Sequence, residues 1–265
     1  MSIFQRPTGP GMIKRTNPVT LVMIIIVTSV YIMQLITPAF GISLAELGAL
    51  KAYDHEGFVH TVTLNTQFYR FVTSIFLHGS PTHYLFNTFF GLFIIGGALE
   101  RLIGPKKYAI TLAISGLGGS LVVYGYNVFM WELLQNQDAL RPTLGASGAI
   151  YGVMGFLLYL TLKRPMWFAP QDISGIRSLI LINVVLTFLA PNISIPGHLG
   201  GLTFGLVAAF FLTDQTPFSR AKQQGFFDPH DPYAHEDAYN QDDFFDNLDD
   251  VEIVDDDDDD DRRVW

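Results

Sequence analysis

The chain has 265 residues, of which 49% are hydrophobic and 14% aromatic, and its formal net charge is −9. Its acidity is confined to one end: residues 214–265 hold 18 acidic and 4 basic side chains, whereas residues 1–213 carry a net charge of +5. Cysteine is absent, which excludes disulfides and thiolate chemistry, and no basic stretch of the kind that binds nucleic acid occurs. The first 213 residues therefore have the composition of a membrane protein and the remainder that of an acidic tail.

Six apolar segments approach the roughly 20 residues that a helix needs to cross a bilayer. The first is predicted at Val19–Ile36, preceded by Asn17-Pro18 as cap and first helical residue. It is longer than the core of a signal peptide, so we expect it to be retained. The other five are predicted at residues 83–99, 108–129, 146–162, 176–190 and 197–212, the fifth being the shortest.

This pattern predicts an all-α, polytopic membrane protein with a six-transmembrane-helix bundle. Residues 1–18 form a short cytoplasmic segment, 19–213 the membrane domain and 214–265 the tail. Lysine and arginine predict the orientation, because they are enriched on the cytoplasmic side. Leaving out Arg262 and Arg263 far down the tail, the side of the termini holds eleven: Arg6, Lys14, Arg15, Arg101, Lys106, Lys107, Lys163, Arg164, Arg177, Arg220 and Lys222. The opposite side holds Lys51, Arg70 and Arg141, so both termini are expected in the cytoplasm.

Three polar residues lie near the beginnings of the second, fourth and sixth spans: His83, Ser147 and His198. In the predicted orientation these spans all run from outside to inside, so the three side chains share one depth in the outer half of the membrane. Polar groups are costly in hydrocarbon, and each is therefore a functional-site hypothesis. A hydroxyl and an imidazole together are typical of a nucleophile and its base.

Small residues next to these side chains indicate how the helices could meet. Glycines recur along the fourth span at Gly148, Gly152 and Gly155, and along the sixth at Gly201 and Gly205. Gly201 and Gly205 lie three and seven residues after His198, on the same helical face. If the two stripes pack together, as small residues do in membrane helices, Ser147 and His198 face each other.

Two further side chains are candidate hydrogen-bond donors. His83 and Asn87 are four residues apart and share a helical face, from which both can donate toward one point. Acyl transfer needs donors where negative charge develops, and one such donor contributes about 3 kcal/mol. The start of a helix adds free backbone N–H groups, so Ser147 could supply both an attacking oxygen and a donor.

These motifs together resemble the rhomboid intramembrane serine proteases. The resemblance is carried by Gly145-Ala146-Ser147-Gly148 with Tyr151, His198 with Gly201 and Gly205, and His83-x-x-x-Asn87 preceded by His78, over residues 66–212. Many bacterial rhomboids have Trp-Arg in the first external loop, where this chain has Tyr69-Arg70. That loop, residues 37–82, is long, and its apolar content predicts partial burial at the membrane surface: Leu44, Leu47, Leu50, Phe58, Val59, Phe68 and Phe71.

The resemblance implies specific roles. Ser147 is the nucleophile and His198 the general base, in a dyad without an acidic member. The oxyanion hole consists of the side chains of His83 and Asn87 and the N–H of Ser147, and Tyr151 stacks on His198. Substrates are transmembrane segments of membrane proteins, cut near the outer leaflet after lateral entry from the bilayer beside the fifth span. No metal or organic cofactor is needed, and a bacterial cell membrane is the expected location.

Other interpretations stay open at this point. Ser147 or His198 alone is typical of helix packing, and His83 with Asn87 alone of interhelical hydrogen bonding. A catalytically silent relative would lack Ser147 or His198, and a small transporter would use His83, Asn87 and His198 as a polar pathway. We interpret His78 as support for the external loop and Asn183 as packing or gate polarity.

The tail ends in seven consecutive aspartates, Asp255–Asp261, among scattered aromatic residues. Such self-repelling sequence cannot bury a core, which predicts disorder. It is either a solvated extension or a docking segment for a basic cytoplasmic partner.

Overall fold

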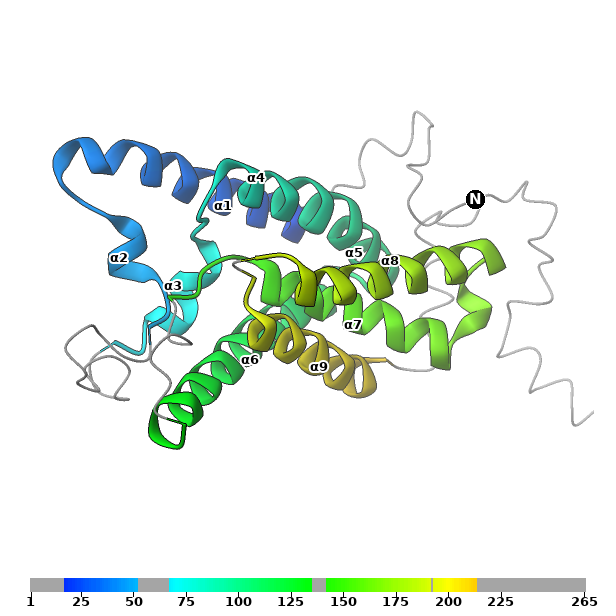
Figure 1. Ribbon diagram of the computed structural model, residues 1–265. Helices are drawn as coiled ribbons and strands as arrows, with labels where there is room; N and C mark the ends of the chain where they lie inside the picture. The colour runs from blue at the N-terminus through cyan, green and yellow to red at the C-terminus, as the bar shows by residue number, and fades with distance from the viewer. Residues whose placement is uncertain (1–16, 52–66, 135–141, 192, 214–265) are drawn as a thin grey trace, which may run out of the picture. The chain divides into compact units, whose positions relative to one another are not determined.

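The computed structural model describes residues 17–51, 67–134, 142–191 and 193–213 (Figure 1). All of the described residues belong to one compact unit. Among these residues the regular elements are helices. Leu50 and Thr143 form an isolated antiparallel β-bridge. The prediction of an all-α membrane fold is confirmed. The predicted tail lies outside the described residues.

The longest helices are α1 (Pro18–Ile36), α6 (Pro105–Glu132), α7 (Ser147–Lys163), α8 (Pro170–Leu189) and α9 (Ile195–Leu212). The second span is continuous but made of three pieces: α4 (Pro81–Leu85), the π-helix η2 (Phe86–Gly96) and α5 (Gly97–Ile103). Shorter helices fill the connections: η1 (Thr37–Phe40), α2 (Leu44–Gly48) and α3 (Arg70–Phe76) before the second span, and η4 (Pro165–Trp167) between α7 and α8.

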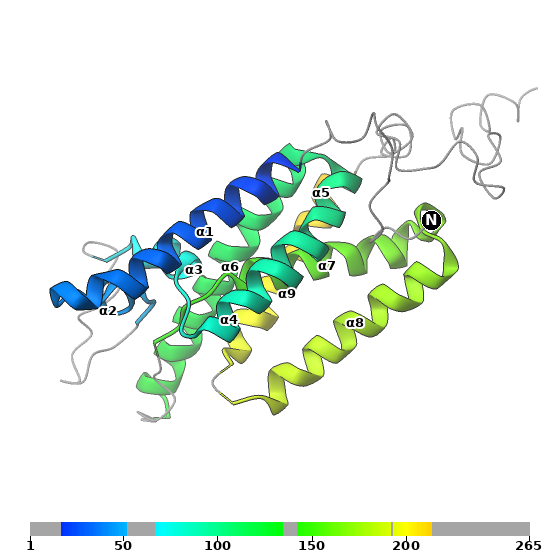
Figure 2. The same cartoon turned by 90° about the horizontal axis from the view of Figure 1, so that it is seen from above.

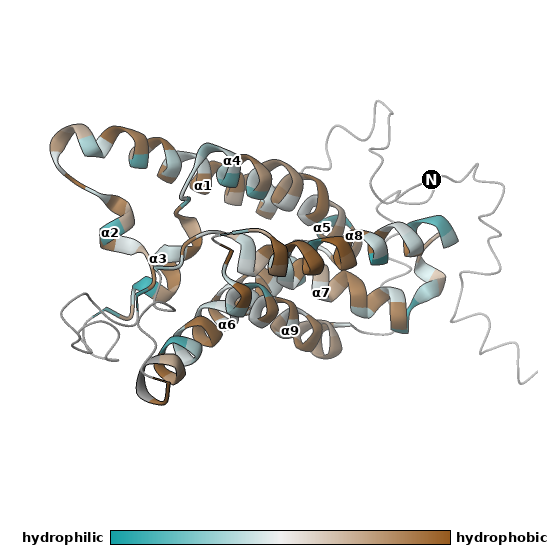
Figure 3. Ribbon diagram, viewed as in Figure 1, coloured by the Kyte–Doolittle hydropathy of each residue, from teal (hydrophilic) through white to brown (hydrophobic). Residues whose placement is uncertain are grey.

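In the described part of the chain, five helical stretches are long and apolar enough to cross a membrane: residues 18–40, 81–103, 105–130, 170–189 and 195–212. The remaining predicted span, α7, is a shorter apolar helix of 17 residues. The fifth span is not short: it begins at Pro170 rather than at residue 176 and has 20 residues. Its first turns contain Gln171 and Asp172, which a hydropathy reading leaves out (Figure 3). Asp172 is buried there, where the helix dipole favours negative charge.

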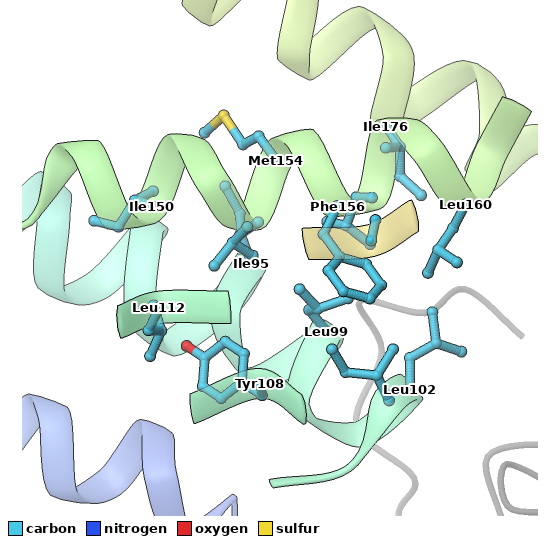
Figure 4. Close-up of a cluster of buried hydrophobic side chains, with 14 of the residues drawn as sticks. Ile95, Leu99, Leu102, Tyr108, Leu112, Ile150, Met154, Phe156, Leu160 and Ile176 are labelled. Atoms are coloured by element: carbon cyan, nitrogen blue, oxygen red, sulfur yellow. The ribbon is translucent and has the colours of Figure 1, made fainter. Parts of the chain in front are cut away.

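The helices α6, α7 and α9 pack against one another, and α7 also contacts η2 and α8. Figure 2 shows α1 and α8 on opposite sides, with the span from α4 to α5 between them. Buried apolar side chains from α5, α6 and α7 form the main core (Figure 4). Phe156 and Leu160 of α7 and Leu99 of α5 are fully buried in it. Apolar side chains on the outer faces of the spans are exposed, as expected of surfaces that meet lipid.

Contact between α7 and α9 is made by backbone. A Cβ atom at Gly201 would overlap the carbonyl oxygen of Gly148, and one at Gly205 would overlap that of Gly152. The structure therefore brings the two glycine stripes into direct contact, because any side chain there would force the helices apart.

The start of α1 differs from the prediction in how it is capped. Pro18 is the first helical residue, but the side chain of Asn17 makes no capping hydrogen bond. Instead, the N–H groups of Val19 and Thr20 donate to the two carboxylate oxygens of Glu100 on α5, at 2.9 and 2.8 Å. Glu100 is 2% exposed, so a buried carboxylate satisfies two amides at the positive end of the helix dipole.

Candidate active site

Ser147 is the first residue of α7, and the segment that leads to it is held by main-chain hydrogen bonds. The N–H and carbonyl of Leu50 pair with those of Thr143 at 2.8 and 2.9 Å, and the N–H of Gly145 donates to the carbonyl of Ser74 at 2.8 Å. Gly145 has a φ of +128°, which favours glycine. The half-buried Ser147 thus begins a helix whose first N–H groups lack intrahelical partners.

His198 is the fourth residue of α9 and is buried. The helix is capped by Ser194, whose hydroxyl accepts from the N–H of Gly197 at 3.2 Å. A Cβ atom at Gly148 would lie 3.4 Å from the carbonyl oxygen of Gly197. The residue after Ser147 therefore lies against the residue before His198, which brings the two candidate dyad residues to one end of the α7–α9 contact.

Tyr151, one turn after Ser147, stacks on His198. The ring centroids are 3.9 Å apart and the planes differ by 21°. The hydroxyl of Tyr151 donates to the carbonyl of Asn183 on α8 at 2.7 Å and lies 2.6 Å from the hydroxyl of Thr187. The ring that fixes the plane of the imidazole is thus itself fixed by α8.

His83 and Asn87 converge on the peptide that precedes Ser147. A Cβ atom at Gly145 would lie 2.7 Å from Nε2 of His83 and 3.6 Å from Nδ2 of Asn87. The N–H of Gly79 donates to Nδ1 of His83 at 3.4 Å, so a neutral ring carries its proton on Nε2 and can donate. Nδ2 of Asn87 is buried without a hydrogen-bond partner among the described residues. Both nitrogens are therefore donors available to an anionic oxygen.

His78 supports the external loop. Its side chain is buried against the rings of Tyr31, His83 and Tyr84, and its backbone exchanges hydrogen bonds with the side chain of Gln34 at 2.9 and 3.1 Å. Burial, with a smaller contribution from His83, lowers the pKa of His78 to about 4. The ring is therefore neutral at physiological pH.

The loop is closed by Tyr69 and Arg70. The buried Arg70 donates from Nη1 to the carbonyls of Glu46 and Ala49 at 2.9 and 2.7 Å. The hydroxyl of Tyr69 donates to the carbonyl of Leu47 at 3.1 Å.

The loop's apolar side chains divide between the interior and the surface. Leu50 and Phe71 are buried, whereas Leu47 and Phe68 are exposed. The predicted Phe58 and Val59 lie outside the described residues. Within the described part of the chain, no three His, Asp or Glu side chains are grouped so that they could hold a metal ion.

Thr187 of α8 was not identified from the sequence. It is buried, and its hydroxyl lies 3.0 Å from Nδ1 of His198. Asn183 was noted only as a polar residue in an apolar span. The available signal was that the two polar residues are four positions apart and so share a face of the fifth span.

Comparison with known proteins identifies the chain at the level of family. Residues 65–215 match the model of the Rhomboid domain. The rhomboid protease GluP of Bacillus subtilis is 33% identical over 143 residues, 54% of this chain and 26% of the relative. The putative rhomboid protease YdcA of the same organism is 32% identical over 146 residues, 55% of this chain and 68% of the relative.

A third relative aligns over a longer part of the chain. The rhomboid protease GlpG of Yersinia pseudotuberculosis is 25% identical over 202 residues, which is 75% of this chain and 64% of the relative. The chain thus spans from about a quarter to two thirds of the lengths of these three proteins. Since the domain match alone covers more than half of the chain, the resemblance seen in the sequence is confirmed: the chain belongs to the rhomboid family.

Proposed function

We propose that this protein is an intramembrane serine endopeptidase that cleaves transmembrane segments of membrane proteins near the outer leaflet, using Ser147 and His198. One observation carries the proposal. Tyr151 stacks on His198 across a glycine-lined helix contact that has Ser147 at its end, while the donor nitrogens of His83 and Asn87 converge on Gly145, two residues before Ser147. This arrangement supports the roles of nucleophile, base, base-orienting group and oxyanion donors for residues of three spans.

In the first half of the reaction, Nε2 of His198 accepts the proton of Ser147 as Oγ attacks the carbonyl carbon of the substrate. The carbonyl oxygen becomes an oxyanion, which accepts hydrogen bonds from His83 Nε2, Asn87 Nδ2 and the N–H of Ser147. As the C–N bond breaks, His198 returns the proton to the departing amine, leaving an ester on Ser147.

In the second half, water attacks the ester carbonyl while His198 again accepts a proton. The new oxyanion is held by the same donors, and its collapse releases the carboxylic acid and restores Ser147. A helical substrate hides its carbonyls in intrahelical hydrogen bonds, so the segment to be cut must unwind locally. We propose entry beside α8, whose outer half presents exposed apolar side chains to lipid.

The remaining predictions complete the proposal. Residues 19–213 form the protease domain, both termini lie in the cytoplasm of a bacterial cell, and residues 214–265 serve as a solvated or docking tail. The lysine and arginine bias supports the orientation.

The test is cleavage of a reporter transmembrane substrate in liposomes. We expect Ser147→Ala to abolish cleavage, and equal cleavage by this variant and the wild type would refute the nucleophile. His198→Ala should lose labelling of Ser147 by a fluorophosphonate, because the base that activates the serine is gone. Asn87→Ala should lower kcat about 10²-fold with Ser147 still labelled, since one oxyanion donor is removed.

A further inference from the structure

Thr187 places a hydroxyl at Nδ1 of the imidazole of His198, which leaves Nε2 as the other ring nitrogen. Its Oγ1 is 3.0 Å from Nδ1 of His198, 3.0 Å from the carbonyl of Asn183 and 2.6 Å from the hydroxyl of Tyr151. Thr187 is 1% exposed, so no bulk water competes for these contacts. The hydroxyl therefore lies at the centre of a closed polar cluster formed by three helices.

Counting protons limits what this cluster can do. The carbonyl of Asn183 only accepts, and each hydroxyl has one proton to give. If the proton of Tyr151 is shared between the carbonyl of Asn183 and the hydroxyl of Thr187, and Thr187 donates its own proton to the carbonyl of Asn183, the remaining lone pair of Thr187 faces Nδ1 of His198. A lone pair there requires Nδ1 to carry the proton, which leaves Nε2 unprotonated.

That arrangement is the one that a base toward Ser147 needs, because only an unprotonated Nε2 can accept the serine proton. In Ser-His-Asp triads a buried carboxylate holds this tautomer. Among the described residues the buried carboxylates are Glu100, which caps α1, and Asp172. Asp172 lies 15 residues before Thr187 on α8, about 22 Å away along a helix.

We propose that Thr187 is the positioning residue of the catalytic base: its hydroxyl accepts the Nδ1 proton of His198, fixes the imidazole in the Nδ1–H tautomer and directs Nε2 at Ser147. The proposal rests on the proposed proteolytic function and gives the dyad a third, neutral member supplied by α8. Thr187 touches neither substrate nor serine, so it acts only through His198.

The chain offers a matched control. Thr203 on α9 is a second threonine whose hydroxyl donates to the carbonyl four residues earlier, that of Leu199, at 2.8 Å. It is exposed, and no contact with His198 is made. Thr187→Val and Thr203→Val each remove one such hydroxyl with little change in shape, but only the first removes the partner of Nδ1.

The experiment combines kinetics with a direct reading of the tautomer in the full chain. We expect Thr187→Val to lower kcat about tenfold or more with KM unchanged, Thr187→Ser to restore at least half of the wild-type kcat, and Thr203→Val to leave it unchanged. ¹⁵N NMR of imidazole-labelled protein at pH 8, with His198 assigned by loss of its signals in His198→Asn, should show the Nδ1–H form. In Thr187→Val we expect a mixture of tautomers.

Wild-type kcat in a folded Thr187→Val, or an Nε2–H tautomer at His198 in the wild type, would overturn the proposal. The NMR result holds even if Thr187→Val fails to fold. Retained cleavage by Ser147→Ala would instead overturn the proteolytic function, so the two failures are distinguishable.

Discussion

The contact between α7 and α9 and the contact that α8 makes with these two helices are built differently. Between α7 and α9, the carbonyls of Gly148 and Gly152 lie against Gly201 and Gly205, so the backbones of the two helices are in direct contact. On α8 the buried residues form one narrow row: Asp172, Ile176, Ile180 and Thr187. The proposed nucleophile and base thus lie at the close backbone contact, whereas the groups that contact Nδ1 and the ring of Tyr151 come from α8. Distance within the dyad and orientation of its base are therefore controlled by separate interfaces.

The close contact should tolerate no added atom. Gly205→Ala places a methyl group on the carbonyl of Gly152, where only helix backbone could move. We expect a loss of about 3 kcal/mol in stability and roughly 10²-fold in kcat, because a small shift misaligns Ser147 and His198. Thermal unfolding in detergent and liposome cleavage measure the two effects. Unchanged values for both would show that the helices can separate without cost.

Tyr151 contacts His198 on α9 with its ring and α8 with its hydroxyl, so two substitutions can separate the contributions of the two contacts. Tyr151→Phe keeps the ring on His198 and loses the hydroxyl that contacts Asn183 and Thr187, whereas Tyr151→Ala loses both. We expect kcat to fall a few-fold in the first variant and about fivefold further in the second, since aromatic stacking contributes about 1 kcal/mol. Equal loss in the two variants would assign the whole effect to the hydroxyl.

The beginning of α8 is tied to α7 by Arg177, whose Nη2 donates to the carbonyl of Thr161 at 2.6 Å. Arg177→Met should cost under about 1 kcal/mol, because the arginine is exposed. It should raise amide hydrogen exchange at the start of α8 while cleavage stays within twofold. Arg164→Met is the control, because the side chain of Arg164 donates only to the carbonyl of its neighbour Lys163 in the described hydrogen bonds. Equal amide exchange at the start of α8 in the two variants would show that the hydrogen bond from Arg177 does not hold this part of α8 to α7.

The smallest effect is expected with the opposite sign. Gly175 lies within α8, and a Cβ atom there would meet nothing within 4 Å. Gly175→Ala should stabilise the protein by about 0.5–1 kcal/mol, because alanine loses less backbone entropy in a helix. Thermal unfolding of Gly175→Ala and of Gly205→Ala under the same conditions compares the effect of one added methyl group on α8 and at the α7–α9 contact. Destabilisation by Gly175→Ala would mean that α8 packs more closely than its buried row indicates.

Much of the architecture could be predicted from the sequence because the membrane imposes a simple requirement of length and apolarity. The spans followed from that requirement, while the polar first turns of α8 did not, since Asp172 is accommodated by burial and the helix dipole. Glu100 was missed because it caps a helix 80 residues away, whereas Asn17-Pro18 gave a local cap signal. Thr187 was missed because a threonine in an apolar helix commonly bonds to its own backbone, and its contact with His198 depends on how α8 packs.

Main-chain hydrogen bonds join the segment before Ser147 to the external loop in the described part of the chain, from Leu50 to Thr143 and from Ser74 to Gly145. Peptide groups are the same in every residue, so these bonds do not depend on which side chains the loop carries. Substitutions in the loop that keep these peptide groups in place should therefore leave the position of the segment before Ser147 unchanged.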